Sequence, residues 1–459
     1  MVFSSSVFLL VFLPAVLIIN RILPLKMRNV FLLFANLVFY AYGEPVYVLL
    51  MVASIVFNYY VAIFIEKAPS VKSKKAWLVF AVVMNIGALC FFKYTGLFAD
   101  TLRKIPFLSS IPEFELRLPV GISFYTFQAV SYVIDVYRGD YRRAENFVNF
   151  SAYISLFPQL IAGPIVRYCD VARQLKERYD SAPMFSTGVR FFAIGLAKKV
   201  MLANQFGIVW DMVSKDPASF GTLGAWIGII AFSLEIYFDF AGYSDMACGL
   251  GKMLGFDFCQ NFNYPYISKS ITEFWRRWHI SLGTWFRDYV YIPLGGNRVK
   301  KGRLCFNLIV VWMLTGFWHG AGWNFLAWGF YYGVLLLFEK LVFGKILKKL
   351  PDFVCHIYTL VLVATGWVFF ASESFAKAFD YLKVMFVPHG GNVTLFAGWV
   401  VTFIVGIIAS TPLPKALWMR FNEKRKLSFA ETVLCMAALI LCIASLVTDS
   451  YNPFLYFRF

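Results

Sequence analysis

The sequence predicts an all-α protein that crosses a membrane several times, and three observations lead to this fold class. Hydrophobic residues make up 60% of the 459 positions and charged residues 15%, whereas soluble proteins average roughly 45–50% and about 25%. The mean hydropathy is +0.66. The apolar residues gather into successive stretches with basic residues between them. A soluble core cannot bury this much apolar surface, so we expect a polytopic protein surrounded by a lipid bilayer.

The apolar stretches are predicted to be the membrane spans. In chain order they are Val2–Ile19, Val30–Tyr42, Val46–Ile65, Trp77–Phe92, Trp226–Phe240, Leu304–Phe317, Trp323–Phe338, Val354–Phe370, Leu395–Ala409 and Phe429–Val447. Several are shorter than the ~20 residues that a perpendicular helix needs to cross a bilayer. We expect flanking residues to extend them, or the protein to thin the bilayer around them.

The formal net charge of +17 is spread over clusters between these stretches. Basic residues follow the first and third stretches and recur at 298–303, 340–349 and 415–426, while turns such as Gly43–Pro45 carry none. Because basic loops face the cytoplasm, this alternation predicts an extracytoplasmic N-terminus in a cell (inner or plasma) membrane. The clusters form no single stripe, so nucleic acid is not expected as a partner.

No linker or low-complexity tract divides the chain, and one integral domain over residues 1–459 is expected. Between about Pro119 and Tyr332, glycine, proline and charged residues interrupt the apolar segments. Broken backbone is tolerated at membrane depth only where protein or a wet cavity surrounds it. Residues 119–332 are therefore the expected functional core.

Within this core, the segment Ile271–Trp285 has the periodicity of one amphipathic helix. Its apolar stripe consists of Ile271, Phe274, Trp275, Trp278, Leu282 and Trp285. Glu273 can reach Arg276 or Arg277 at the i+3 and i+4 spacings. One interpretation is an interfacial helix with its arginines in water. A lipid-facing arginine costs roughly 2.5–3.5 kcal/mol, so these arginines and Arg287 must face water, a carboxylate or a substrate.

Two of the 4 histidines, His279 and His319, lie in aromatic, glycine-containing sequences. Ionisable groups are costly in so apolar a chain, and their position needs a reason. A neutral imidazole can take a proton from an attacking hydroxyl near neutral pH. Trp318 can wall His319 against water, and Arg276 is a possible anion contact beside His279. The alternative for each histidine is a structural role at the membrane interface.

Asp239 and Asp245 are carboxylates in an otherwise apolar run. They can orient a histidine or pair with an arginine of the 275–287 region, and an ion pair that only joins helices is the alternative. None of the 8 cysteines forms a C-x-x-C pair, and neither histidine has a metal-ligand pattern beside it, so no metal site is expected. The chain has no phosphate-binding loop motif, which disfavours an ATP-driven pump.

Two of these sequences resemble the signatures of the membrane-bound O-acyltransferase (MBOAT) superfamily. The first runs from Asn263 to Gly296 and includes Trp275-Arg276-Arg277-Trp278-His279 and Trp285-Phe286-Arg287-Asp288. The second is Leu314-Thr315-Gly316-Phe317-Trp318-His319-Gly320. Residues 157–168, 239–245 and 451–459 resemble the bacterial branch typified by the membrane subunit of alginate O-acetylase, and the similarity covers nearly the full chain.

The resemblance implies a ring of roughly 11 or more tilted transmembrane helices, with re-entrant or interfacial helices, around a central tunnel. It implies His319 as the catalytic residue and His279 as a second one. Candidates for the tunnel or the substrate contacts are Trp275, Arg276, Trp278, Arg287, Asp288, Trp318, Asp239 and Asp245. It also implies cytoplasmic acetyl-CoA as donor, no bound cofactor, an alginate-like exopolysaccharide as acceptor, and an extracytoplasmic SGNH-type acetyltransferase as partner.

Other acceptors remain open for the same fold: D-alanine transferred to teichoic acid, acetyl to peptidoglycan, or an acyl chain to a protein. A solute transporter that uses the histidines as a proton relay is the alternative from another class. Secondary transporters often have matching broken helices in two halves, and the sequence shows no such pair.

Overall fold

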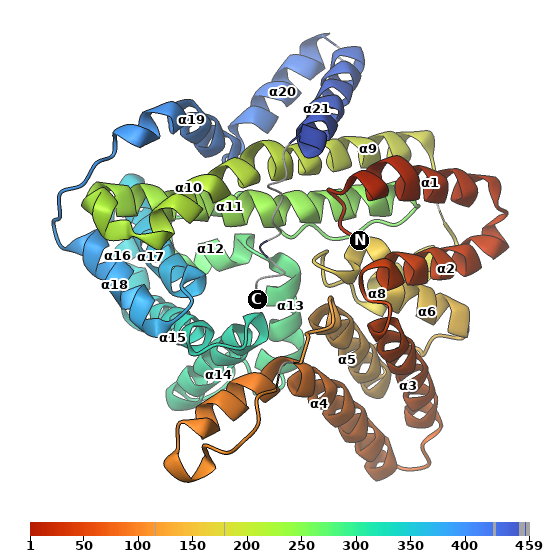
Figure 1. Cartoon of the computed structure of the whole chain (residues 1–459). Coiled ribbons are helices and arrows are strands. Elements are labelled where there is room, and N and C mark those ends of the chain that lie inside the picture. The colour runs from red at the N-terminus through yellow and green to blue at the C-terminus, as the bar shows by residue number, and fades with distance from the viewer. Residues whose placement is uncertain (115, 179, 426–427, 449–454, 456–459) are drawn as a thin grey trace. The chain divides into compact units, whose positions relative to one another are not determined.

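The computed structural model describes residues 1–114, 116–178, 180–425, 428–448 and 455 (Figure 1). Every regular element in these residues is a helix, which confirms the all-α fold class. Among them, 7 helices are long and apolar enough to cross a membrane, or up to 8 if one bent pair counts as a span.

These helices differ from the predicted spans in three ways. The predicted spans Val30–Tyr42 and Leu304–Phe317 fall on the helices Leu25–Gly43 and Lys301–His319, which are not among these candidates. Ala182–Lys215 is a candidate span that the sequence analysis did not include, because Arg190, Lys198 and Lys199 interrupt its apolar residues. The first predicted span falls instead on a shorter apolar helix, Phe8–Ile22. The roughly 11 spans implied by the resemblance exceed those assigned by length and apolarity, since several helices fall short of the ~20 residues of a perpendicular crossing.

The chain forms two compact units, and the first comprises Met1–Phe192 and Ser244–Cys259. Its helices are η1 (Phe8–Phe12), α1 (Leu13–Ile22), α2 (Leu25–Gly43), α3 (Tyr47–Lys67), α4 (Val71–Arg103), η2 (Pro106–Leu108), α5 (Ile122–Arg138), α6 (Phe147–Ser155), α7 (Phe157–Leu160) and α8 (Tyr168–Lys176). Packed phenylalanine rings form part of its core, with Phe39 and Phe157 at 5.3 Å between centroids.

The second unit comprises Ala193–Tyr243 and Gln260–Phe459, and α9 (Ala182–Ala197) and α11 (Pro217–Met253) belong to both units. Its other helices up to residue 347 are η3 (Lys198–Ala203), α10 (Asn204–Lys215), η4 (Pro265–Ile267), α12 (Ile271–Arg277), α13 (Ile280–Phe286), η5 (Arg287–Tyr291), α14 (Lys301–His319), α15 (Trp323–Phe338), η6 (Glu339–Phe343) and α16 (Gly344–Leu347). The remaining ones are α17 (Asp352–Ala371), α18 (Phe375–Phe386), η7 (Thr394–Trp399), α19 (Val400–Ala409), α20 (Leu413–Arg425) and α21 (Ser428–Thr448).

Within the second unit, α14 and α15 pack side by side (Figure 1). Glycines allow this close approach: a Cβ atom on Gly316 would lie 2.3 Å from the carbonyl oxygen of Phe325, and one on Gly329 would lie 2.4 Å from that of Trp312. Small residues are the usual means by which membrane helices bring their backbones together. The packing fixes the end of α14, where His319 is the last residue.

Candidate active site

The candidate active site begins at a break in the segment predicted to be one helix. The prediction of a continuous helix over 271–285 is wrong, because α12 ends at Arg277 and α13 begins at Ile280. Between them His279 has left-handed backbone angles (φ 44°, ψ 55°), which cost a residue other than glycine roughly 1–2 kcal/mol. Backbone strain of this kind concentrates at functional sites.

Hydrogen bonds from Asn261 hold the chain in this broken conformation. The amide of Ile280 donates to the Asn261 carbonyl oxygen at 3.0 Å. The amide of Ser281 donates to the Asn261 side-chain oxygen at 3.2 Å. Both backbone amides at the start of α13 therefore have partners. On the other side of the break, the amide of Asn263 donates to the carbonyl oxygen of Arg277 at 3.0 Å, so the chain is held on both sides of His279.

The two histidines converge on Trp318. The His319 ring centroid lies 5.0 Å from that of Trp318, and the His279 ring lies 6.1 Å from the same indole. Both histidines are buried, with 9% and 2% of their surface exposed. The structure therefore brings together, in one unit, two residues that the sequence analysis selected from separate motifs.

Aromatic rings surround this pair. His319 packs edge-on against Trp328 at 5.1 Å and Phe370 at 5.3 Å, and His279 packs against Phe240 of α11 at 4.7 Å. Trp275 and Trp278 belong to the same cluster: Trp275 contacts Trp328 at 5.4 Å, and Trp278 contacts Trp367 at 4.9 Å. We call these rings the aromatic cluster. It is an apolar wall that suits a short acyl chain better than a charged group.

The protonation of His279 follows from its surroundings. Burial lowers the pKa of His279 well below the ordinary histidine value, so the ring is neutral at physiological pH. In the described residues neither ring nitrogen is hydrogen-bonded to another side chain. A neutral imidazole with an uncommitted nitrogen can accept a proton or a hydrogen bond from a hydroxyl.

The three arginines of this region differ in their partners and exposure. Arg277 pairs with Glu273 at 2.8 Å, which confirms the predicted i+4 contact. Arg287 is exposed and pairs with its neighbour Asp288 at 2.7 Å, and Arg276 is exposed on α12. Two of the three charges are therefore paired within the chain, and the exposed arginines must still face water or a substrate and not lipid.

Asp239 forms a buried ion pair, but its partner is not an arginine. Its carboxylate lies 2.6 Å from the Lys199 ammonium group, and both side chains are at most 4% exposed. The other carboxylate oxygen accepts a hydrogen bond from the backbone amide of Leu455 at 2.9 Å. Its neighbour in the chain, Phe240, contacts His279. Asp245 belongs to the other unit.

The sequence analysis missed two buried ionisable residues of this unit, Lys199 and Glu339. Each lies in or beside an apolar run, so the signal that selected Asp239 was present for both. In the part of the chain that the structure describes, no group of three or more histidine, cysteine, aspartate or glutamate residues could hold a metal ion.

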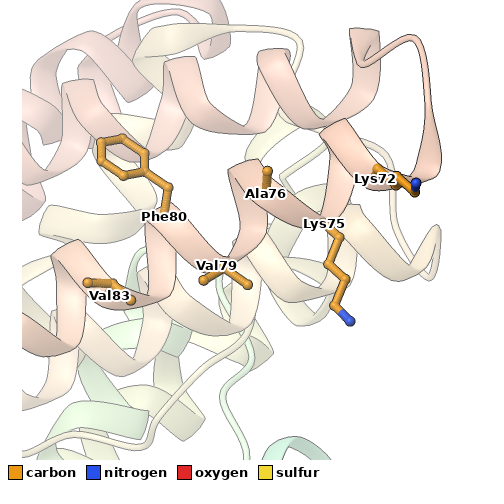
Figure 2. Close-up of a pocket in the computed structure, with 6 residues that line it drawn as sticks. All are labelled: Lys72, Lys75, Ala76, Val79, Phe80 and Val83. Carbon is orange, nitrogen blue, oxygen red and sulfur yellow. The ribbon is translucent and has the colours of Figure 1, made fainter.

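A surface hollow lies elsewhere, on α4 of the first unit (Figure 2). It measures about 580 Å³ and is lined by Lys72, Lys75, Ala76, Val79, Phe80 and Val83. All six residues lie on one face of a helix that is long and apolar enough to cross a membrane. The hollow is lined by no histidine, cysteine, hydroxyl or carboxylate, so we assign it to the outer surface of the protein and not to the active site.

Comparison with known proteins adds to this geometry. Residues 142–372 match the model of the membrane-bound O-acyltransferase family. The chain is 38% identical to a probable alginate O-acetylase of Azotobacter vinelandii, over 100% of both chains. It is 35% identical to a peptidoglycan O-acetyltransferase of Helicobacter pylori over 85% of this chain and 80% of the relative. It is also 31% identical to a teichoic acid D-alanyltransferase of Bacillus subtilis over 60% of this chain and 75% of the relative.

Proposed function

Because this chain belongs to the membrane-bound O-acyltransferase family, we propose that it passes acetyl groups across the membrane to an exopolysaccharide. The family membership expected from the two histidine motifs is confirmed, and the protein is a multi-pass membrane O-acyltransferase. The observation that carries the assignment of the site is the convergence of His279 and His319 on Trp318.

Acetyl-CoA is the proposed donor, and it enters from the cytoplasm. The basic clusters between the spans, in a chain of net charge +17, supply a positive field that attracts a polyanionic coenzyme. In this orientation the N-terminus is extracytoplasmic and the protein resides in the inner or plasma membrane. No resident cofactor is needed, because the thioester carries the activated acyl group.

His319 is the proposed general base. It takes the proton of the acceptor hydroxyl as the hydroxyl oxygen attacks the thioester carbonyl carbon. The new C–O bond forms, the C–S bond breaks, and the thiolate of the coenzyme leaves with the proton from the imidazolium. His279 is the proposed second site residue, because its neutral ring can accept a hydrogen bond beside Trp318. A transient acetyl-imidazole on His319 is the competing route, and rapid-quench labelling with radioactive acetyl-CoA distinguishes the two.

An alginate-like polysaccharide is the proposed acceptor, completed by an extracytoplasmic SGNH-type acetyltransferase as partner. A relative named for alginate O-acetylation aligns over the whole chain at 38% identity, whereas the D-alanyltransferase relative aligns over 60% of it. Peptidoglycan, teichoic acid and protein acceptors are the alternatives. Measuring acetyl and D-alanyl transfer by the same membranes to each acceptor separates them.

The test is the His319→Ala variant in cells that make the polymer. We expect polymer acetylation to be lost while the amount of membrane-inserted protein is unchanged. The matched control is His389→Ala, because His389 lies in an exposed loop. Normal acetylation in the His319→Ala variant would rule out His319 as the general base. Loss of acetylation in both variants would show that the effect is not specific to His319.

A further inference from the structure

A buried carboxylate outside the two histidine motifs links two helices of the site. Glu339 is 4% exposed and begins η6 at the end of α15. One carboxylate oxygen accepts the backbone amide of Ile271 at 2.7 Å and the Tyr358 hydroxyl at 3.4 Å. The other accepts the amide of Thr272 at 2.8 Å and its hydroxyl at 2.6 Å.

These donors are two amides and two hydroxyls, so the carboxylate is stabilised by hydrogen bonds from neutral groups. Burying a carboxylate is expensive unless its oxygens are satisfied. Both oxygens of Glu339 are satisfied here, and the negative charge lies at the positive end of the α12 helix dipole. Three of the four donors belong to α12, so these hydrogen bonds set the position of that helix.

α12 depends on such an anchor because it is short. It has 7 residues, and isolated helices shorter than ~12–15 residues are marginal in water. Its N-cap, Ser270, already accepts the amide of Glu273 at 3.0 Å. The N-terminus of α12 is therefore already capped by Ser270, and Glu339 adds a connection from α12 to the end of α15.

The two linked helices carry different parts of the site. α12 leads directly into His279, and α15 carries Trp328, whose ring lies 5.1 Å from His319. Trp275 of α12 packs against Trp328 at 5.4 Å. A shift of α12 along α15 would therefore move His279 relative to His319. A misplacement of about 1 Å can cost on the order of 100-fold in rate.

We propose that Glu339 is a positioning residue of the acyltransferase site, which holds α12 in register with α15 and thereby places His279 beside Trp318. The proposal rests on the proposed function for its kinetic test. Its structural test, the protection of the Ile271 and Thr272 amides, is independent of which group is transferred and to which acceptor.

The kinetic test compares Glu339→Ala and Glu339→Gln with the parent in reconstituted membranes, with radioactive acetyl-CoA as donor. Alanine removes all four hydrogen bonds, and glutamine keeps one accepting oxygen in the same volume. We expect kcat per folded enzyme to fall roughly 10- to 100-fold in the alanine variant and less in the glutamine variant. The KM for the donor should stay within about 2-fold of the parent value, because both carboxylate oxygens of Glu339 are already occupied by donors of the protein. Glu373→Gln is the control, since Glu373 forms an exposed pair with Lys377.

The structural test is hydrogen exchange measured by mass spectrometry. We expect faster exchange over residues 271–279 in both Glu339 variants, with unchanged exchange in α21. If the Glu339→Ala variant does not fold, the Glu339→Gln variant alone is used for the kinetic test and for hydrogen exchange. Parental kcat per folded enzyme, or parental protection of residues 271–279, would overturn the proposal. If the parent itself transfers no acetyl group, the proposed function fails, while faster exchange would still support the role of Glu339.

Discussion

Replacing Asp239 with asparagine should destabilise the protein strongly. The carboxylate lies 2.6 Å from the Lys199 ammonium group, with exposed fractions of 3% and 4%. Asparagine keeps the shape and an acceptor for the Leu455 amide but removes the negative charge 2.6 Å from the buried lysine ammonium group. Removing one partner of a buried ion pair costs roughly 3–5 kcal/mol. That loss is a large part of the roughly 5–15 kcal/mol by which typical domains are stable.

The assay is an unfolding titration of the purified protein in detergent, followed by tryptophan fluorescence. The double variant Lys199→Met/Asp239→Leu removes both charges of the pair, and we expect it to recover most of the lost stability because neither charge is left buried without the other. Asp352→Asn is the control: it breaks the exposed pair with Lys269, which should contribute about 0–1 kcal/mol. The reasoning is refuted if Asp239→Asn falls within about 1 kcal/mol of the parent, or if the double variant is as unstable as the single one.

Three further predictions concern the helix packing and His279. Gly316→Ala and Gly329→Ala place a methyl group 2.3 and 2.4 Å from backbone carbonyl oxygens, and each should lower the free energy of unfolding by about 1–3 kcal/mol in the same titration. Gly283→Ala is the control, because nothing lies within 4 Å of its added methyl group and its stability should not fall. Equal stabilities of the three variants would contradict the close packing. His279→Gly should be about 1 kcal/mol more stable than His279→Ala, because glycine adopts left-handed angles without strain; the reverse order would contradict the backbone assignment. Burial lowers the pKa of His279 in the folded state, so the unfolded chain takes up a proton first as the pH falls. The free energy of unfolding should therefore decline below about pH 6.5, by at most about 1.4 kcal/mol per pH unit. His279→Gln should flatten this dependence of stability on pH, and an unchanged slope would contradict the assignment of the pH dependence to His279.

Features that depend on composition or on near neighbours in the sequence were predictable. The all-α membrane fold followed from hydropathy, and the Glu273–Arg277 pair followed from the i+4 spacing. The break at His279 was not predictable, because hydrophobic periodicity continues through a residue with left-handed angles. The Lys199 partner of Asp239 and the Glu339 link to α12 were missed for another reason: the chain folds distant segments together, and no local pattern records which ones.

The aromatic cluster around the two histidines also bears on the fate of the activated acyl group. A base that deprotonates a sugar hydroxyl can equally deprotonate water, and the thioester would then be wasted by hydrolysis. The carbon faces and edges of these rings offer a water molecule none of the two to four polar partners that it needs to reside in a cavity, so a water here depends on the indole N–H groups and the imidazole nitrogens. If the acceptor is the proposed polysaccharide, the walls formed by Trp318, Trp328 and Phe370 favour transfer over hydrolysis, because a sugar has apolar faces that can pack on these rings and water has none.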